Sequence, residues 1–369
     1  MNDQLEQYLA DKQRQGLYRT RQLTPAVCLN FSCNDYLSLS TDARVLQAYQ
    51  TGFQLYPAGS GGSMVLSGYH TAHRDLEQAF AKALAVDDCL LFSSGYVANL
   101  AVVSLLAQFG VHALIDKAVH ASIYDGLTLS GISYSRFAHN DLMSLEHKLA
   151  TAGAQAMVMT ESVFSMSGQQ APIAAIATLA ARYGCGLMVD EAHGFGVIGT
   201  HGMGGTHAAG LSQTDVPLRI IPFGKALAGS GAVVVGQAVW IDALLQATRQ
   251  PVYSTSISPA MAYGMLITLQ ILQEADDRRQ HLTHLVVYFR QCIEHSSYAW
   301  RDSLSPIQQL QLGCPHRAMQ MTENLAQSGI RCFAIRQPTV PKHDSGLRIV
   351  LNYHHTTQDI DRLFEMMST

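Results

Sequence analysis

One lysine in the chain lies in an unusual sequence setting. Lys225 stands between the apolar pair Ile220-Ile221 and the glycine-rich segment 229–231, which leads into the apolar run 232–235. Long charged side chains are rarely buried without a partner or a task. One interpretation is a turn lysine whose amine reaches water. The other is a desolvated, nucleophilic amine that forms a Schiff base with a carbonyl cofactor.

A carboxylate and an imidazole follow another apolar run. Asp190 ends the run 187–189, and His193 comes soon after it beside Gly194 and Gly196. A carboxylate at the end of a buried strand is partly desolvated and needs a cationic partner. A metal bound by Asp190 and His193 is one alternative, but no third ligand stands nearby. The glycines favour room for a flat ring instead.

A third segment predicts an anion site. Residues 89–92 form a short apolar strand, and 93–96 turn into a helix over 97–109. Free N–H groups and the helix dipole converge at such a helix start. The turn is neither a dinucleotide fingerprint nor a Walker loop, so a single phosphate fits better than NAD or ATP. Gly95 would lie at the phosphate with Tyr96 over it, although a core tyrosine is the alternative for Tyr96.

A glycine-rich span precedes these segments. Residues 57–69 contain the run Gly59-Ser60-Gly61-Gly62-Ser63 and then Met64-Val65-Leu66. Glycines permit close backbone approaches, and a flexible linker would be more polar. The span therefore predicts an ordered loop near a ligand.

Strands and helices that alternate along the chain must position these residues. Apolar strands are expected at 89–92, 113–116, 133–137, 156–161 and 186–190, with helices between them. Strands that are apolar throughout predict an α/β fold whose mostly parallel sheet is covered on both faces. Ligands bind at the carboxyl ends of such strands. The polar residues expected there are Ser94, Gly95, His120, Glu161, Ser165, Asp190, His193 and Lys225.

The chain divides into three predicted parts. Residues 1–40 contain a helix over 4–23 and a short strand at 27–31. Residues 41–275 form the large α/β domain, and residues 276–369 form a smaller α+β domain. A long helical stretch over 260–296 precedes strands near 307–310 and 347–351, a helix at 316–328 and a final helix at 358–367.

Composition excludes several classes of protein. The chain has 369 residues, a net charge of −4, 48% hydrophobic and 14% charged residues. The charge gives no support for nucleic-acid or acidic-membrane binding, and we find neither a membrane-length apolar run nor a signal peptide. Seven scattered cysteines without a C-x-x-C pair favour reduced thiols. We expect a cytoplasmic protein with no metal site.

An amine, a carboxylate and a phosphate-type turn together suit pyridoxal 5'-phosphate. At this point the chain closely resembles the α-oxoamine synthases, fold-type I pyridoxal-phosphate enzymes that condense an amino acid with an acyl thioester. Each motif is weak alone, but their order is highly specific. The motifs are 30–37, 59–63, 94–99, 189–194, 223–225 and 253–256. The resemblance implies a seven-stranded, mostly parallel sheet sandwiched by helices and a smaller C-terminal α+β domain.

The resemblance also implies roles at the cofactor ring. Lys225 would hold the cofactor and later remove the Cα proton, and Asp190 would pair with the ring nitrogen. His120 would stack on the ring and would act as a catalytic residue with these two. His193 would hydrogen-bond the phenolic oxygen, with Ser165 close by.

At the phosphate, the implied residues come from two subunits. Gly95 and Tyr96 would lie near it in one subunit. Ser254 and Thr255 would reach it from a second copy of the chain, so a homodimer is implied.

Two further segments, 136–141 and 335–341, resemble the branch of the family that serves biotin synthesis. That branch joins L-alanine to pimeloyl-CoA or a pimeloyl-acyl carrier protein. Arg19, Thr339 and His120 would contact substrate, Arg348 is a candidate partner for a carboxylate, and the 59–63 loop would border the thioester. The alternatives are a synthase that uses glycine and acetyl-CoA, and a non-catalytic α/β protein with a decayed site.

Two positions depart from the family pattern. Pro222 stands where the family usually has threonine or serine, three residues before the lysine. One hydrogen bond to the cofactor, about 0.5–1.5 kcal/mol net, is then missing. Met64 follows the glycine loop where several relatives carry arginine, so contacts with the acyl chain or its carrier are expected to differ there.

Overall fold

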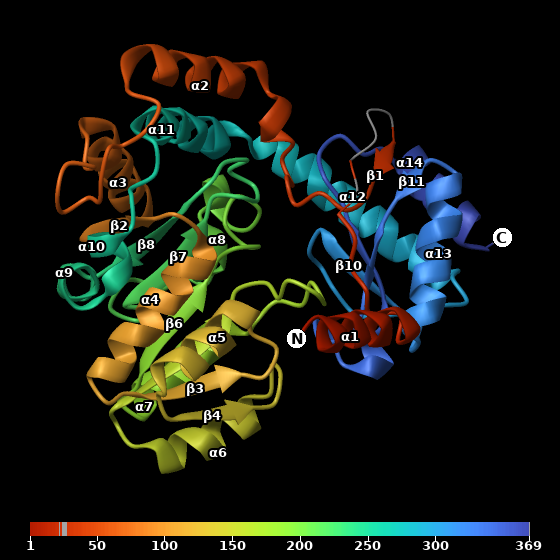
Figure 1. Ribbon diagram of the computed structural model, residues 1–369, viewed down its shortest axis with the longest axis horizontal. Helices are drawn as coiled ribbons and strands as arrows, with labels where there is room; N and C mark the ends of the chain where they lie inside the picture. The colour runs from red at the N-terminus through yellow and green to blue at the C-terminus, as the bar shows by residue number, and fades with distance from the viewer. Residues whose placement is uncertain (22, 24–27, 369) are drawn as a thin grey trace. The chain divides into compact units, whose positions relative to one another are not determined.

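The computed structural model describes all residues except 22, 24–27 and 369, and the chain forms two compact units (Figure 1). The large unit comprises Leu37–Phe164 and Gln170–Arg279. The small unit comprises Met1–Tyr36, Ser165–Gln169 and Gln280–Thr369. No helix in the described part of the chain is long and apolar enough to cross a membrane.

A seven-stranded sheet forms the centre of the large unit, with the strand order β2-β8-β7-β6-β5-β3-β4. Strand β8 is antiparallel to both of its neighbours, and all other pairs are parallel. The strands are β2 (Asp88–Phe92), β3 (His112–Asp116), β4 (Tyr134–Phe137), β5 (Ala156–Glu161), β6 (Gly186–Asp190), β7 (Leu218–Pro222) and β8 (Ala232–Gly236). The predicted mostly parallel, seven-stranded sheet is confirmed.

Helices cover both faces of this sheet, which is why its strands are apolar throughout. Met188, Leu218 and Ile220 enter one core with residues of α4, α5 and α9, whereas Leu187 and Val189 enter another with α6 and α7 (Figure 1). The helices are α4 (Gly95–Gln108), α5 (Ala121–Ser130), α6 (Leu142–Ala152), α7 (Ile173–Arg182) and α9 (Ala238–Ala247). Alternate residues of each central strand therefore pack into opposite layers.

The strand ends that precede the candidate site residues lie at one edge of the sheet. Strands β2 and β7 both run antiparallel to β8, so they run in the same direction as each other. Strands β6, β5, β3 and β4 are parallel to β7 in succession. The carboxyl ends of β2, β3, β5, β6 and β7 consequently share one edge.

Two further helices of the large unit approach each other closely. A Cβ added to Gly52 in α2 (Ala43–Leu55) would lie 2.3 Å from the carbonyl oxygen of Ala260 in α11 (Pro259–Glu274). A Cβ added to Gly264 in α11 would lie 2.5 Å from the Tyr49 ring. Glycine is needed at both positions because any side chain would push these helices apart. The remaining elements of this unit are η1 (Leu39–Thr41), α3 (Thr71–Leu84), η2 (Thr200–Gly202), α8 (Gly204–Ala208) and α10 (Arg249–Tyr253).

The small unit contains a four-stranded antiparallel sheet of order β12-β13-β10-β9 and a short parallel pair, β1-β11. Its strands are β1 (Leu29–Asn30), β9 (Ala299–Trp300), β10 (Ile307–Gln311), β11 (Ile330–Arg331), β12 (Phe333–Ile335) and β13 (Gly346–Val350). Its helical elements are α1 (Asn2–Arg14), α13 (Pro315–Gln327), η3 (Lys342–Asp344) and α14 (Thr357–Ser368), and α12 (Asp276–Glu294) enters it from the large unit. Part of the predicted strand 27–31 lies outside the described residues.

Two predicted helices end differently in the structure. The predicted helix over 4–23 is confirmed only as far as Arg14, where α1 ends, because Gly16 has φ +66°, a left-handed conformation that stops a helix. The predicted stretch 260–296 consists of α11 and α12, which are interrupted at Ala275, where ψ is 40°. Asp276 and Asp277 then lie in the first turn of α12, where carboxylates favour a new helix start.

A buried histidine makes the small unit sensitive to acid. His355 is 4% exposed, stacks on Phe31 with ring centroids 4.2 Å apart, and its Nδ1 accepts the N–H of Asn352. Burial lowers the pKa of His355 to about 4. As the pH falls from 6.5 towards 4, the unfolded chain takes up a proton that the folded chain does not, so stability decreases across this window.

We therefore expect the wild type to lose up to about 3 kcal/mol of unfolding free energy over this pH window through His355 alone. The His355→Gln variant should lack this part of the slope, whereas a variant of the exposed neighbour, His354→Gln, should keep it. Urea unfolding from pH 7 to pH 4 measures the difference. Parallel curves for the wild type and His355→Gln would refute the assignment.

Candidate active site

Three of the predicted residues meet at the shared edge of the large sheet. Asp190 ends β6 and is 3% exposed, Lys225 follows β7 and is half-buried, and His120 follows β3 and caps α5. Burial lowers the pKa of His120, the Lys225 charge lowers it further, and the Asp190 carboxylate opposes both. His120 therefore senses both the Asp190 and the Lys225 charge, and a neutral imidazole is favoured.

The Asp190 carboxylate accepts hydrogen bonds from neutral donors. The Asn99 side-chain amide donates to Oδ2 at 2.8 Å, and the Ala192 backbone N–H donates to Oδ1 at 2.9 Å. These bonds fix its orientation but do not balance its charge. A protonated ring nitrogen would pair with this carboxylate, so Asp190 fits pyridoxal phosphate. Among the described residues, no group of three or more His, Cys, Asp or Glu side chains could hold a metal ion.

Asn99 is a site residue to which the sequence analysis gave no role. It is 1% exposed in α4, and its Oδ1 has no hydrogen-bond partner. A buried amide is expected to be hydrogen-bonded, so an asparagine in an apolar helix signals a polar task. An amide side chain within 97–106, where Ser104 is the only other polar residue, was the sign that could have revealed it.

The predicted phosphate turn begins α4 as expected. Ser94 is the N-cap, and its Oγ accepts the Val97 N–H at 3.2 Å. Gly95 and Tyr96 open the helix, where the first N–H groups lack intrahelical partners and attract an anion. Tyr96 is 41% exposed, so it is not a core residue. Its ring lies edge-on to the His120 ring, with ring centroids 6.3 Å apart.

Pro222 lies directly against this turn. A Cβ added to Gly95 would be 2.4 Å from Cγ of Pro222, so the proline ring occupies the space beside the helix start. Proline offers no hydroxyl and no N–H there. The residues otherwise suit the cofactor, and only this donor is lacking from the family pattern.

We expect the Pro222→Thr variant to bind pyridoxal phosphate about 2- to 10-fold more tightly, because a hydroxyl would restore one hydrogen bond worth about 0.5–1.5 kcal/mol. Titration of the apo-protein with the cofactor measures the dissociation constant. Pro222→Ala is the matched control, since it removes the ring without adding a hydroxyl. Equal gains in both variants would show that relief of the ring contact, not the hydroxyl, is responsible.

Three further residues of the large unit that were predicted to bind the cofactor, His193, Ser254 and Thr255, lie on two loops. His193 is 5% exposed in the turn after Asp190. Ser254 and Thr255 follow α10, are exposed, and line a small cavity with Ser93 and Val97 beside the start of α4.

The glycine-rich loop is tied to the segment that carries Ser254 and Thr255. The Ser60 hydroxyl donates to the Ser256 carbonyl at 3.0 Å, and the Ser256 N–H donates to the Gly62 carbonyl at 3.0 Å. The loop is thus fixed by hydrogen bonds to Ser256, as an ordered loop requires.

In the small unit, Arg348 holds the segment that carries Ser165. Arg348 lies on β13, is 8% exposed, and donates from Nε to the Ser165 carbonyl at 2.5 Å and from Nη2 to Oδ1 of Asn34 at 2.9 Å. Both acceptors are neutral, so the guanidinium charge remains available to a substrate carboxylate.

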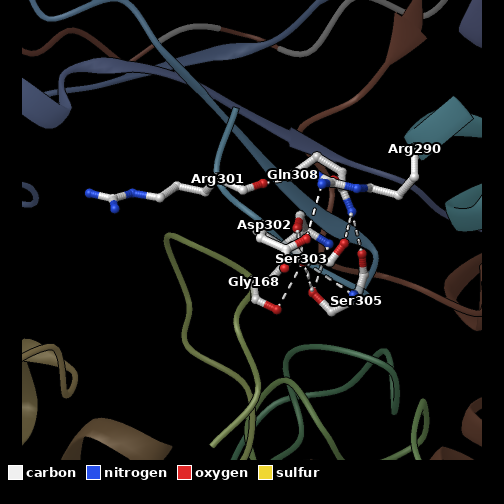
Figure 2. Close-up of polar contacts among 8 residues, drawn as sticks. Gly168, Arg290, Arg301, Asp302, Ser303, Ser305 and Gln308 are labelled. Atoms are coloured by element: carbon white, nitrogen blue, oxygen red, sulfur yellow. Dashed lines mark hydrogen bonds and ion pairs between the residues drawn. The ribbon is translucent and has the colours of Figure 1, made fainter. Parts of the chain in front are cut away.

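A serine cluster fixes the other end of this segment (Figure 2). The Ser303 hydroxyl donates to the Gly168 carbonyl at 2.9 Å, and the Gln308 amide donates to the Ser305 carbonyl at 2.7 Å. The Arg290 guanidinium donates a hydrogen bond to the Arg301 carbonyl at 2.9 Å and so stabilises the same turn. Ser165–Gln169 is therefore part of the small unit although its chain neighbours belong to the large one.

Arg19 and Thr339 come together although 320 residues separate them. A guanidinium nitrogen of Arg19 lies 3.3 Å from Oγ1 of Thr339, to which it donates. Both side chains are exposed and belong to the small unit. Two of the predicted substrate residues are thus neighbours.

Comparisons with known proteins fit this arrangement. The model of the family "Aminotransferase class I and II" matches residues 26–367. An 8-amino-7-oxononanoate synthase of Pseudomonas savastanoi pv. phaseolicola is 38% identical, covering 100% of this chain and 96% of its own, and one of Marinobacter nauticus is 36% identical, covering 98% and 94%.

Solved structures agree. An 8-amino-7-oxononanoate synthase from Francisella tularensis superposes with a TM-score of 0.82 at 30% identity, covering 92% of this chain and 97% of its own. A serine palmitoyltransferase of Sphingomonas wittichii superposes with a TM-score of 0.88 at 28% identity, covering 92% and 86%.

The fold and the site at the carboxyl ends of the strands thus define a fold-type I pyridoxal-phosphate enzyme. The chain belongs to the class I and II aminotransferase family, and within it to the family of the 8-amino-7-oxononanoate synthases. The family resemblance, the fold class and the dependence on pyridoxal phosphate that were expected from the sequence are confirmed.

Proposed function

We propose that this enzyme condenses L-alanine with a pimeloyl thioester, giving 8-amino-7-oxononanoate, CO2 and free CoA or acyl carrier protein, a step of biotin biosynthesis. One observation carries the proposal. Lys225, Asp190 and His120 converge at the sheet edge beside a phosphate-type helix start, in a chain whose relatives bear that name at 36–39% identity.

Each of these three residues has a distinct task. Pyridoxal phosphate, when bound, supplies an electron-withdrawing ring next to the α-carbon of alanine. Lys225 anchors the cofactor and then takes the proton from that α-carbon. The buried Asp190 carboxylate, oriented by Asn99, keeps the ring nitrogen protonated, and the neutral His120 imidazole packs on the ring face.

The rest of the cofactor site follows the same logic. The N–H groups of Gly95 and Tyr96 bind the phosphate, while His193 and Ser165 lie towards the phenolic oxygen. Ser254 and Thr255 are exposed, which suits a role towards a second copy of the chain. We infer a cytoplasmic homodimer whose subunits comprise an N-terminal segment (1–40), a large cofactor domain (41–275) and a small domain (276–369).

Substrate binding falls to the small unit and to His120. Arg348 has neutral hydrogen-bond partners and suits the carboxylate of alanine. Arg19 and Thr339 form a neighbouring pair that suits the acyl substrate. The 59–63 loop borders the thioester.

A thiol-release assay tests the pairing of substrates. The enzyme is supplied with L-alanine or glycine and with pimeloyl-CoA or acetyl-CoA, in all four combinations. We expect rapid CoA release only with L-alanine and pimeloyl-CoA. Preference for glycine with acetyl-CoA would instead assign the chain to the glycine-using branch, and no release after cofactor loading would indicate a decayed site.

A further inference from the structure

One buried carboxyl of the large unit has no task in the chemistry described so far. Glu77 lies in α3 and is 7% exposed. The Leu91 backbone N–H donates to its Oε1 at 3.1 Å, and the Tyr69 hydroxyl donates to its Oε2 at 2.5 Å. Burial raises the pKa of Glu77 to about 7, although both hydrogen bonds lower it. Because a carboxyl is costly to bury, its presence here calls for a reason.

The Leu91 N–H lies at the open edge of the large sheet. In the described sheet β2 is the first strand of the order and pairs on one side only, with β8, where Leu91 is opposite Val233. A backbone N–H on the other side has no strand to accept it, and Leu91 is only 4% exposed, so water reaches it poorly. Glu77 is the acceptor that this buried N–H requires.

The strand that Glu77 holds leads directly into the phosphate turn. Phe92 ends β2, and Ser94, three residues after Leu91, is the N-cap of α4. So short a connection leaves little freedom, and the direction of the first N–H groups of α4 depends on where β2 ends. On its other side the turn packs against Pro222, which offers an apolar contact but no N–H or hydroxyl. The hydrogen bond to Glu77 is therefore important for the position of these donors.

The second partner of Glu77 belongs to a different segment. Tyr69 ends the glycine-rich span 57–69, and its ring stacks on the His73 ring with ring centroids 6.1 Å apart. Nε2 of His73 lies in turn 2.8 Å from the Ile257 carbonyl oxygen. The Tyr69 bond thus connects Glu77 to the glycine-rich span, whereas the Leu91 bond connects it to the phosphate turn.

We propose that Glu77 is a positioning residue for the cofactor phosphate: by holding the Leu91 N–H, it fixes the end of β2 and directs the first N–H groups of α4 towards the anion. This role rests on the proposed function, in which the start of α4 binds the phosphate. Glu77 acts through β2, so its loss weakens the hold on the phosphate group and leaves Lys225 and Asp190 in place for the ring. A displacement of donors by a fraction of an ångström is enough to weaken such contacts.

Paired titrations of the apo-protein with pyridoxal 5'-phosphate and with pyridoxal, which lacks the phosphate, isolate this effect. In Glu77→Leu a buried N–H loses its acceptor, so the dissociation constant for pyridoxal 5'-phosphate should rise about 5- to 30-fold, while that for pyridoxal should change less than about twofold. Glu77→Gln keeps an acceptor oxygen at the same reach and should restore most of the affinity. Glu77→Asp withdraws the carboxylate by one methylene and should not restore it.

Two matched variants separate positioning from loss of stability. Leu76→Ala, at a fully buried neighbour in α3, removes packing without removing a hydrogen bond. It should lower the melting temperature and leave the ratio of the two dissociation constants unchanged. Tyr69→Phe removes the other hydrogen bond of Glu77 and should change this ratio less than about twofold.

The titrations use no substrate, so their result is independent of whether the condensation assay succeeds. Equal weakening of both ligands in Glu77→Leu and Glu77→Asp would overturn the positioning role. If Glu77→Leu does not fold, the contrast between Glu77→Gln and Glu77→Asp decides, and equal phosphate affinity in these two variants would also overturn it. A wild type that bound both ligands equally well would remove the phosphate site at α4, and the role of Glu77 with it.

Discussion

Replacing Lys225 with alanine should reduce turnover on the order of 10³-fold or more and abolish covalent attachment of the cofactor. Lys225 is the amine that follows β7 at the sheet edge and acts electrostatically on His120. Without it, the cofactor has no anchor and the α-carbon of alanine has no base. Borohydride reduction of the loaded protein, followed by peptide mass spectrometry, locates the attached cofactor.

Lys117→Ala is the matched control for this experiment. Lys117 also follows a strand at the same edge, after β3, but it is exposed. Its replacement should leave both turnover and cofactor attachment intact. If Lys225→Ala still carried reduced cofactor on a specific lysine, the anchor would have to be reassigned.

The second large effect is expected at Asp190. The Asp190→Asn variant keeps the side-chain shape and the contact with the Ala192 N–H but removes the charge that would hold the ring nitrogen protonated. Breaking a buried charge pair in this way costs about 3–5 kcal/mol, so the cofactor dissociation constant should rise more than about 100-fold, and turnover should fall with it. Spectroscopic titration of the apo-protein measures the constant.

Asp116→Asn separates this effect from general destabilisation. Asp116 ends the neighbouring strand β3, is 1% exposed, and accepts N–H groups from Ala118 at 2.8 Å and Asn140 at 2.9 Å. Its replacement should lower thermal stability while leaving cofactor affinity within about twofold. Similar losses of affinity in the two variants would mean that Asp190 acts through folding rather than through charge.

Much of the large unit could be predicted because its sequence signals are local. Strands such as 186–190 are apolar throughout, and parallel strands place their carboxyl ends on one edge. Asp190 and His120 were therefore expected at the same edge once the strands 113–116 and 186–190 were recognised. The end of α1 was also signalled locally, by Gly16, although the prediction extended the helix past it.

Contacts between distant segments could not be predicted in the same way. The packing of Pro222 on Gly95 and the bond from Asn99 to Asp190 both depend on residues far apart in the sequence. The sequence indicates that Asn99 lies in an apolar helix, but only the packing of α4 on the sheet shows which polar group its side chain contacts. The same holds for Ser165, whose segment is fixed by Arg348 and Ser303 of another part of the chain.

The fate of the alanine carboxyl carbon decides whether the proposed condensation takes place. The purified, cofactor-loaded enzyme is incubated with pimeloyl-CoA and L-alanine labelled with ¹³C at the carboxyl carbon, and the products are identified by mass spectrometry. We expect 8-amino-7-oxononanoate without label and an equal amount of labelled CO2. A product that retained the label, or release of CoA without an amino ketone, would contradict it.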